Sequence, residues 1–256
     1  MTKTVILCGG IGTRLREQTE FIPKPLVHIG DRPILWHIMN IYKCYGFTEF
    51  ILCLGYKGNA IKDYFLNYEW FSNDFTLDLQ SRNQWITHGN GIENWKITFA
   101  DTGLETLTGG RLYTIKKYLE GEERFMITYG DGLANIDLKR LLEFHEKYKK
   151  IGTITGAHPT SKYGMLKTTP NNVIISFQEK PRLSDYINVG FMVFEKEIFD
   201  YIDKDKMIED VIADLVKARK IAMFPHEGFF HAMDTQKDYE DLNRIWASGN
   251  VPWKIW

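Results

Sequence analysis

A glycine-rich segment near the start of the chain has the residue types that bind phosphate groups. Residues 9–12 contain three glycines, and Thr13 and Arg14 follow at once. Glycines let a backbone approach a phosphate closely and turn its N–H groups toward it. A structural glycine turn would have the same appearance. The spacing differs from two familiar motifs, because a Walker A loop needs a lysine here and a dinucleotide fingerprint needs a glycine at Leu15.

A lysine held between two prolines follows this segment. Pro23 and Pro25 restrict the backbone around Lys24 and are expected to exclude a helix there, so the ammonium group is presented from a stiff segment. A lysine near a phosphate loop can neutralise the charge that builds on a leaving pyrophosphate. Lys24 therefore favours the phosphate-binding interpretation over a purely structural turn.

Two aspartates have the surroundings expected of magnesium ligands. Asp131 lies between two glycines after an apolar run at residues 125–128, which leaves room for a hydrated ion. Asp234 follows an aromatic run and precedes Thr235, whose hydroxyl suits the N-cap of a helix. Mg²⁺ takes one or two carboxylates and completes its octahedron with phosphate oxygens and water. Gly-Asp-Gly is also an ordinary turn sequence, so Asp131 by itself fits a turn equally well.

Two later segments have similar combinations of glycine or proline with a cationic side chain. Residues 109–111, Gly-Gly-Arg, combine a close backbone approach with a cation, and they precede a helix expected at residues 112–119, whose N-terminus would attract an anion. Arg111 has paired donors for a phosphate or a base carbonyl. Lys180, which a proline follows, can hold a phosphate, and Asn188 can bind a hydroxyl group. A glycine turn with a surface arginine, a solvated lysine and a turn asparagine are the structural interpretations of the same residues.

The elements around these residues alternate between strands and helices, which predicts an α/β fold with a Rossmann-like mixed, mostly parallel sheet flanked by helices. Ligands of such sheets bind beyond the carboxyl ends of the strands. We expect strands at residues 5–7, 50–54, 125–128, 153–157, 165–168, 173–178 and 187–194. We expect helices at residues 34–45, 60–66, 112–119, 138–148, 206–218 and 236–246. Residues 69–95 show no clear period and are interpreted as a lid, an oligomer contact or a β-insertion.

The composition limits the classes of partner. The chain has 256 residues, 44% of them apolar, and no repeat or linker marks a boundary. We therefore expect a single domain at residues 1–256, with about residues 150–256 forming its acceptor-side portion. A formal charge of −1 without a long basic run argues against nucleic acid as a partner. The chain lacks a signal peptide and any stretch of roughly 18 apolar residues, so we expect a cytoplasmic protein without a membrane partner.

The glycine-rich segment and the lysine together resemble a known family. Residues 9–15 match Gly-Gly-x-Gly-Thr-Arg-Leu, and Lys24-Pro25 matches its Lys-Pro element, the pattern of sugar-1-phosphate nucleotidyltransferases. Segments over nearly the whole chain narrow the resemblance to the cytidylyltransferase branch: residues 33–39, 55–58, 101–103, 106–111, 129–132, 177–181 and 252–256. The resemblance implies the nucleotide-diphospho-sugar transferase fold and the joining of CTP to a phosphorylated acceptor, with glucose 1-phosphate favoured. It also implies Mg²⁺ as cofactor and a homo-oligomer.

The resemblance also implies a role for each matched residue. Arg14, Lys24 and Asp131 are expected to be catalytic, and Asp131 and Asp234 are expected to hold the metal. The expected nucleotide site comprises Leu7, Cys8, Gly9, Gly10, Ile11, Gly12, Thr13, Arg14, Lys24, Thr106, Arg111 and Gly130. The expected acceptor site comprises Tyr129, Glu179, Lys180 and Asn188.

Alternatives remain open at this point. The chain departs from the family pattern at Val189, at residues 210–212 and at residues 230–232. These departures keep open another phosphorylated acceptor, such as a different sugar phosphate or a phosphorylated amino-acid derivative. A Rossmann-type oxidoreductase would need an acidic ribose-binding residue about 20 residues after the loop, where Lys24-Pro25 stands instead. A silent nucleotide-binding regulator would have no use for both aspartates and Lys24.

Overall fold

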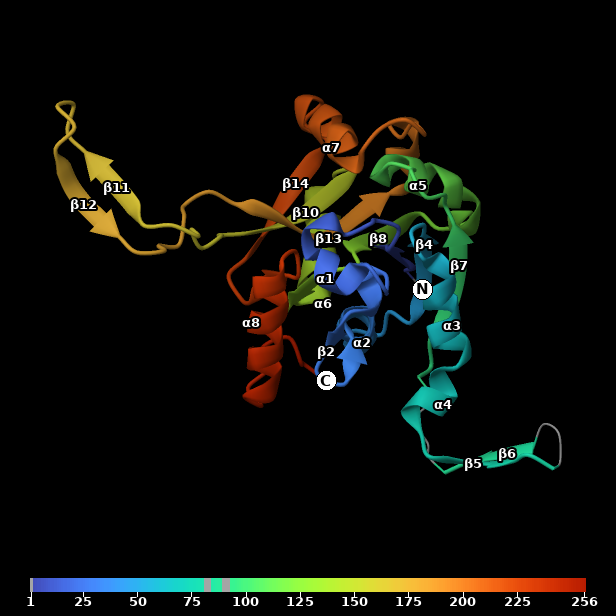
Figure 1. The fold of residues 1–256 in the computed structure, drawn as a ribbon. Helices are drawn as coiled ribbons and strands as arrows, with labels where there is room; N and C mark the ends of the chain where they lie inside the picture. Colours follow the sequence, from blue (N-terminus) through green and yellow to red (C-terminus); the bar gives the residue numbers. More distant parts are fainter. Residues whose placement is uncertain (1, 81–83, 89–92) are drawn as a thin grey trace.

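The computed structural model describes residues 2–80, 84–88 and 93–256, and a mixed sheet forms its centre (Figure 1). Within these residues, seven strands are ordered β14-β10-β13-β8-β1-β4-β7. β13 runs antiparallel to β8 and β10, and the other pairs are parallel. The prediction of a mixed, mostly parallel sheet is therefore confirmed. The strands are β1 (Thr4–Leu7), β4 (Glu49–Leu54), β7 (Lys96–Asp101), β8 (Arg124–Tyr129), β10 (Gly152–Ala157), β13 (Ile187–Glu195) and β14 (Ile221–His226).

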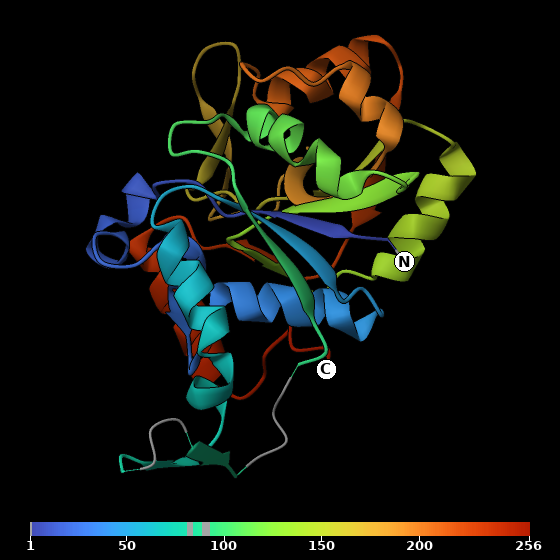
Figure 2. The same cartoon turned by 90° about the vertical axis from the view of Figure 1, so that its right-hand side faces the viewer.

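Helices cover both faces of this sheet (Figures 1 and 2). One face packs against α2 (Ile34–Cys44), α3 (Gly58–Leu66) and α6 (Leu138–Tyr148), and the other against α5 (Thr108–Ile115), η3 (Lys116–Leu119), η4 (Lys196–Asp200) and α7 (Ile208–Lys217). Each face has its own hydrophobic core, and we call the one beside α2 the first core and the one beside α5 the second core. Successive side chains of β1 alternate between them: Ile6 packs in the first core, whereas Val5 and Leu7 pack in the second. Burial on both faces explains why this strand is apolar throughout.

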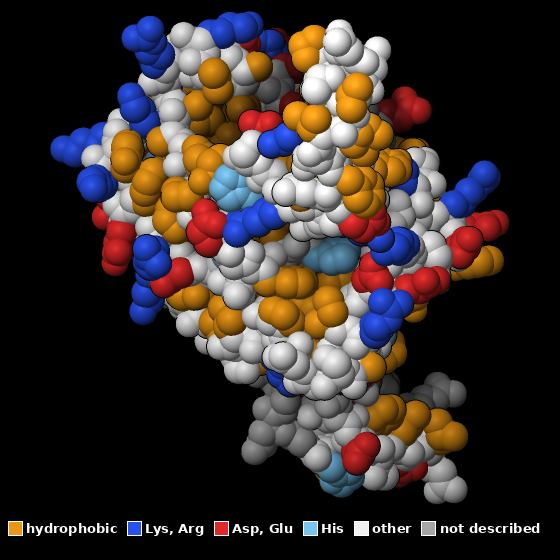
Figure 3. All heavy atoms as spheres, turned by 90° about the vertical axis from the view of Figure 1, so that its left-hand side faces the viewer, with side chains coloured by type: hydrophobic (Ala, Val, Ile, Leu, Met, Phe, Trp, Pro, Cys, Tyr) orange, Lys and Arg blue, Asp and Glu red, His pale blue; other side chains and the backbone are white. Residues whose placement is uncertain are grey.

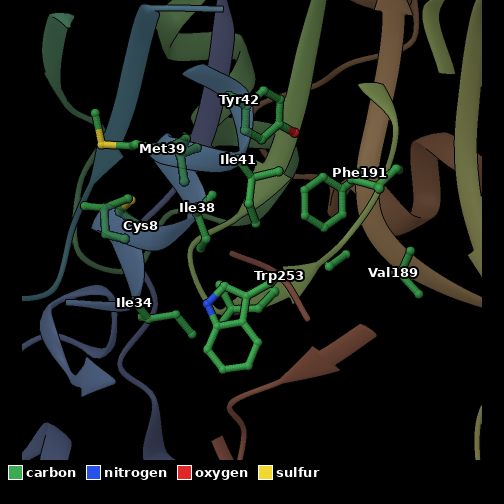
Figure 4. Close-up of a cluster of buried hydrophobic side chains, with 14 of the residues drawn as sticks. Cys8, Ile34, Ile38, Met39, Ile41, Tyr42, Val189, Phe191 and Trp253 are labelled. Atoms are coloured by element: carbon green, nitrogen blue, oxygen red, sulfur yellow. The ribbon is translucent and has the colours of Figure 1, made fainter. Parts of the chain in front are cut away.

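The C-terminal tail is part of the first core (Figure 4). Trp253 is fully buried in one cluster with Ile34 and Ile38 of α2 and with Phe191 of β13. The tail follows α8 (Gln236–Ala247), so residues from both ends of the chain pack together. None of the helices in the described residues is long and apolar enough to cross a lipid bilayer.

Two hairpins project from this body (Figure 1). One consists of β11 (Met165–Thr168) and β12 (Ile174–Gln178), which pair with each other, so these two expected strands do not belong to the central sheet. We call residues 158–186 the arm. The other hairpin consists of β5 (Phe75–Asp78) and β6 (Gln84–Thr87) and follows α4 (Tyr68–Ser72). The β-insertion interpretation of residues 69–95 describes β5 and β6, whereas residues 81–83 and 89–92 of that range lie outside the described residues.

The other predicted elements agree with the structure within about two residues at each end, except for one helix. We expected it at residues 112–119, but α5 begins at Thr108 and the 3-10 turn η3 occupies the second half. Gly109, Gly110 and Arg111 therefore lie inside the first turns of the helix and not before it. Added Cβ atoms on these glycines would clash with the carbonyl oxygens of Lys206 and Lys204. The glycines let α5 pack closely against the segment before α7.

Candidate active site

A cleft of about 380 Å³ lies beyond the carboxyl ends of β1 and β8. Eleven of the twelve residues expected at the nucleotide site line this cleft, and the exposed Ile11 does not. Pro25, Leu107, Thr108 and Met207 line it as well, although they are not among the predicted site residues. The lining residues are Leu7, Cys8, Gly9, Gly10, Gly12, Thr13, Arg14, Lys24, Pro25, Thr106, Leu107, Thr108, Arg111, Tyr129, Gly130, Asp131, Met207 and Asp234.

The glycine-rich loop turns sharply after β1. Gly12 has a φ of +70°, in the left-handed region that favours glycine. Its carbonyl oxygen accepts hydrogen bonds from the Leu15 N–H and the Thr19 hydroxyl, both at 3.0 Å. A Cβ on Gly9 would clash with the Arg111 guanidinium, whereas nothing lies within 4 Å of a Cβ on Gly10. Gly10 is therefore a point where a ligand can approach the backbone.

Lys24 contacts both candidate metal ligands. Its Nζ lies 2.5 Å from Asp131 Oδ2 and 2.9 Å from Asp234 Oδ1. Lys24 begins a 3-10 turn, η2 (Lys24–Leu26), so the expectation that the prolines exclude any helix is wrong for this one turn. The turn tolerates Pro25 because the first N–H groups of a helix have no partner within it.

A short ribbon brings the two aspartates together. β9 (Gly132–Ala134) follows Asp131, and β15 (Phe230–Ala232) precedes Asp234. These strands pair antiparallel, with Ala232 opposite Gly132, and the Met233 N–H donates to the Asp131 carbonyl at 2.9 Å. After Asp234 the chain enters α8, where Thr235 is the N-cap and forms a capping box with Asp238, as its position before the helix predicted.

The charges around this cluster balance. Arg14 joins it through a contact of 3.1 Å between its NH2 group and Asp234 Oδ1, so two cations face two carboxylates. Burial on its own lowers the pKa of Lys24, but the carboxylates of Asp131 and Asp234 outweigh burial and raise it above the ordinary lysine value. Lys24 therefore stays charged throughout the neutral range.

The donor set suits a hard cation with few protein ligands. The described residues contain no group of three or more His, Cys, Asp and Glu side chains that could hold a metal ion. Asp131 and Asp234 are two carboxylates in an open cleft, which fits Mg²⁺ because this ion usually binds one or two carboxylates and keeps substrate and water oxygens.

Arg111 connects the loops around the cleft through hydrogen bonds. Its NH1 group donates to Thr102 Oγ1 at 2.7 Å, to the Gly103 carbonyl at 2.8 Å and to the Leu54 carbonyl at 3.1 Å. Its NH2 group donates to the carbonyls of Gly9 and Leu104, at 3.1 and 3.2 Å. These contacts occupy the N–H groups of both terminal nitrogens. Arg111 lines the cleft as expected, but its guanidinium binds the protein where we had expected a base or phosphate.

Tyr129 links three elements at the rim of the cleft. Its hydroxyl donates to Glu209 Oε1 at 2.7 Å, and Glu209 Oε2 accepts from the Thr108 hydroxyl at 3.2 Å. Burial and the neighbouring Glu209 carboxylate raise the pKa of Tyr129, so it remains a neutral donor. Glu209 is not among the predicted site residues, because its partners Tyr129 and Thr108 come from distant segments.

The other expected acceptor residues do not line this cleft. Glu179 and Lys180 directly follow β12 within the arm, and Lys180 has a side chain 62% exposed and a φ of 47°. The side-chain oxygen of Asn188 accepts the Gly190 N–H at 2.8 Å, a hydrogen bond within the first residues of β13. Tyr129 is the expected acceptor residue that the described structure places at the cleft.

The departures from the family pattern have structural explanations. Val189 is buried in the first core (Figure 4). Asp210 accepts the Met207 N–H at the start of α7, at 3.2 Å. His231 contacts Asp238 of the α8 cap at 3.1 Å. None of these three side chains lines the cleft in the described structure.

A glycine-rich loop after β1 lines one cleft with a lysine and two carboxylates, at the carboxyl ends of the strands of a mixed α/β sheet, and this arrangement fits the nucleotidyltransferase class. The chain belongs to the nucleotidyl transferase family, whose family model matches residues 3–243.

Proteins of named function resemble this chain over its full length. A protein of Bacillus subtilis strain 168, described as a "probable glucose-1-phosphate cytidylyltransferase", is 47% identical over 99% of this chain and all of its own length. The glucose-1-phosphate cytidylyltransferase of Salmonella typhimurium strain LT2 is 41% identical over 99% of both chains. Among solved structures, HddC from Yersinia pseudotuberculosis superposes with a TM-score of 0.70, at 25% identity, over 96% of this chain and 100% of its own.

Proposed function

We propose that this protein transfers the cytidylyl group of CTP to glucose 1-phosphate, which yields CDP-glucose and pyrophosphate. The observation that carries the proposal is the contact of Lys24 with Asp131 and Asp234 beside the glycine-rich loop. The choice of CTP and glucose 1-phosphate follows the full-length relatives that carry this name at 41–47% identity. CTP and sugar phosphates are cytoplasmic metabolites, so the proposed location is the cytoplasm.

The reaction is an in-line displacement at the α-phosphorus of CTP. An oxygen of the acceptor phosphate forms the new P–O bond, the bond between the α-phosphorus and the bridging oxygen of the β-phosphate breaks, and pyrophosphate leaves with the electron pair. A phosphate monoester is largely ionised near neutral pH, so the reaction needs no general base. The protein contributes positioning and neutralisation of charge.

Several residues of the cleft have a place in this scheme. The loop backbone at Gly10 and the guanidinium of Arg14 hold the β- and γ-phosphates, and Lys24 stabilises the charge on the departing pyrophosphate. Asp131 and Asp234 would hold Mg²⁺, which supplies positive charge to the phosphates when bound. Thr106 and the first turn of α5 line the same cleft, and the nucleoside lies against them.

We infer that a second copy of the chain completes the acceptor side. Lys180 and Glu179 lie outside the cleft of their own chain, on an arm that extends away from the body (Figure 1). Figure 3 views the molecule from the side on which the arm projects and shows apolar side chains exposed there. The arm exposes Tyr163, Leu166, Ile175 and Phe177 to 54–78%, an apolar surface that a partner would cover. We therefore propose that the protein is a homo-oligomer.

Mixing two inactive variants tests the shared site. Asp131→Asn lacks a cleft residue and Lys180→Ala lacks an arm residue, so mixed oligomers contain some intact sites and should regain activity after subunit exchange. A monomer in light scattering, or no recovery in mixtures with proven exchange, would contradict the inference.

A panel of substrates tests the activity itself. Pyrophosphate release is measured with Mg²⁺, each of CTP, UTP, dTTP and GTP, and a set of phosphorylated acceptors. The proposal expects the highest kcat/KM for CTP with glucose 1-phosphate. A higher value for another sugar phosphate or a phosphorylated amino-acid derivative would replace the acceptor, whereas higher values for dTTP or GTP would overturn the cytidylyl assignment.

A further inference from the structure

The ammonium group of Lys24 lies between the two carboxylates that the proposed function assigns to Mg²⁺. Its Nζ contacts Asp131 at 2.5 Å and Asp234 at 2.9 Å, and its side chain is 12% exposed. The other cation of the cluster, Arg14, contacts Asp234 at 3.1 Å from a side chain that is 73% exposed. Lys24 is therefore the cation that is enclosed between both ligands.

We propose that Lys24 is a displaceable occupant of the metal site, which keeps the free protein from binding a divalent cation tightly before the nucleotide arrives. This proposal rests on the proposed function and concerns the order in which ligands bind. Metal and nucleotide enter together, and the ammonium group of Lys24 moves from the two carboxylates to phosphate oxygens.

The charges of the cluster support this exchange. Lys24 and Arg14 already balance Asp131 and Asp234. A divalent cation added to this balanced cluster would leave two positive charges uncompensated in a partly enclosed cleft, where charge is costly. The triphosphate of CTP supplies the missing negative charge and gives the ammonium a new partner. Binding of metal and nucleotide must then favour each other, with the same coupling free energy in both directions.

The local structure lets the ammonium move while its backbone stays in place. Pro23 and Pro25 flank Lys24, and the η2 turn is closed by hydrogen bonds from the Leu26 N–H to the Pro23 carbonyl at 2.8 Å and from the Val27 N–H to the Lys24 carbonyl at 3.1 Å. The side chain is an unbranched chain of methylene groups, so its charged end can change partners by rotation about single bonds.

Direct metal binding tests the proposal without turnover. The free Mn²⁺ signal in electron paramagnetic resonance is titrated with protein, in the absence of any acceptor. The wild-type protein should bind Mn²⁺ weakly by itself, and Lys24→Met should bind it at least about tenfold more tightly, because a unit charge in contact with both ligands is removed. Lys24→Gln serves as a second variant, and Asp131→Asn added to Lys24→Met should abolish the gain.

Arg14→Met is the matched control. It removes a charge of the same sign from the same cluster, but one that is mostly exposed and touches one ligand, so the Mn²⁺ affinity should rise less than about threefold. Addition of CTP to the wild-type protein should tighten Mn²⁺ binding by at least about tenfold, and the same addition should tighten it less in Lys24→Met.

Two results would overturn the proposal: equal Mn²⁺ affinity of the free wild-type protein and Lys24→Met, or equal gains from Lys24→Met and Arg14→Met. Failure of the proposed function would look different. It would appear as no pyrophosphate from CTP and glucose 1-phosphate with the wild-type enzyme, whatever the Mn²⁺ affinities.

Discussion

Replacement of Arg111 separates two roles that this residue can have. The residue is 4% exposed, and its guanidinium donates to five acceptors. Three of these acceptors belong to the buried residues Gly9, Leu54 and Thr102, whereas water can replace the guanidinium at the other two, which belong to exposed residues. At about 1 kcal/mol for each buried hydrogen bond, Arg111→Met should lower the free energy of unfolding by roughly 3 kcal/mol.

The measurement has two parts, one on stability and one on nucleotide selectivity. Urea unfolding gives the free energy, with the exposed Lys117→Met as the matched control, for which we expect a change below about 0.5 kcal/mol. Because protein acceptors, among them the Gly9 carbonyl, engage the guanidinium of Arg111, kcat/KM should fall by a similar factor for CTP and UTP. A stable Arg111→Met protein that has lost its preference for CTP would refute this reasoning and restore Arg111 as a base-binding residue.

Three further outcomes follow from the same contacts. Asp131→Asn should abolish most Mg²⁺-dependent turnover without unfolding the protein, since an amide is a poor substitute for a hard anionic ligand; near-wild-type rates at saturating Mg²⁺ would contradict the metal assignment. Lys24→Ala should lower kcat more than it weakens CTP binding, because its charge acts as pyrophosphate leaves. Burial lowers the pKa of His37 to about 4, so the unfolded state takes up the proton first as pH falls. The free energy of unfolding should therefore fall by about 2 kcal/mol between pH 7 and pH 5, because the stability from burying the neutral imidazole is present above about pH 6.5 and is lost as pH falls below it. Urea unfolding of His37→Gln should lack this part of the pH dependence.

Much of the fold could be predicted because its elements have strong local patterns. The helix predicted at residues 138–148 has the bounds of α6, and Asp137 caps it. β14 was missed because Pro225 interrupts its pattern, and it lies at the edge of the sheet, where a proline is tolerated. The start of α5 was missed since two glycines are poor helix formers, and their value lies in packing against a segment almost 100 residues away.

The site was predicted in part for a similar reason. The glycine-rich loop and Lys24 could be interpreted from residue type and spacing, and Gly-Asp-Gly marked Asp131 as a strand-end carboxylate. The pairing of Asp131 with Asp234 came from the family resemblance, because it depends on a ribbon of two three-residue strands whose sequences show no period. The contacts of Arg111 with five carbonyl and hydroxyl oxygens could not be predicted, since four of the five acceptors are backbone carbonyls that have no sequence signal.

Transfer of the α-phosphorus is the most direct test of the central claim. CTP labelled with ³²P at the α-position is incubated with glucose 1-phosphate, Mg²⁺ and the protein, and the products are separated by chromatography. We predict that the label moves into CDP-glucose in step with pyrophosphate release, and that Asp131→Asn does not transfer it. Label that stays in CTP, or that appears as CMP without a glucose-containing product, would contradict the account.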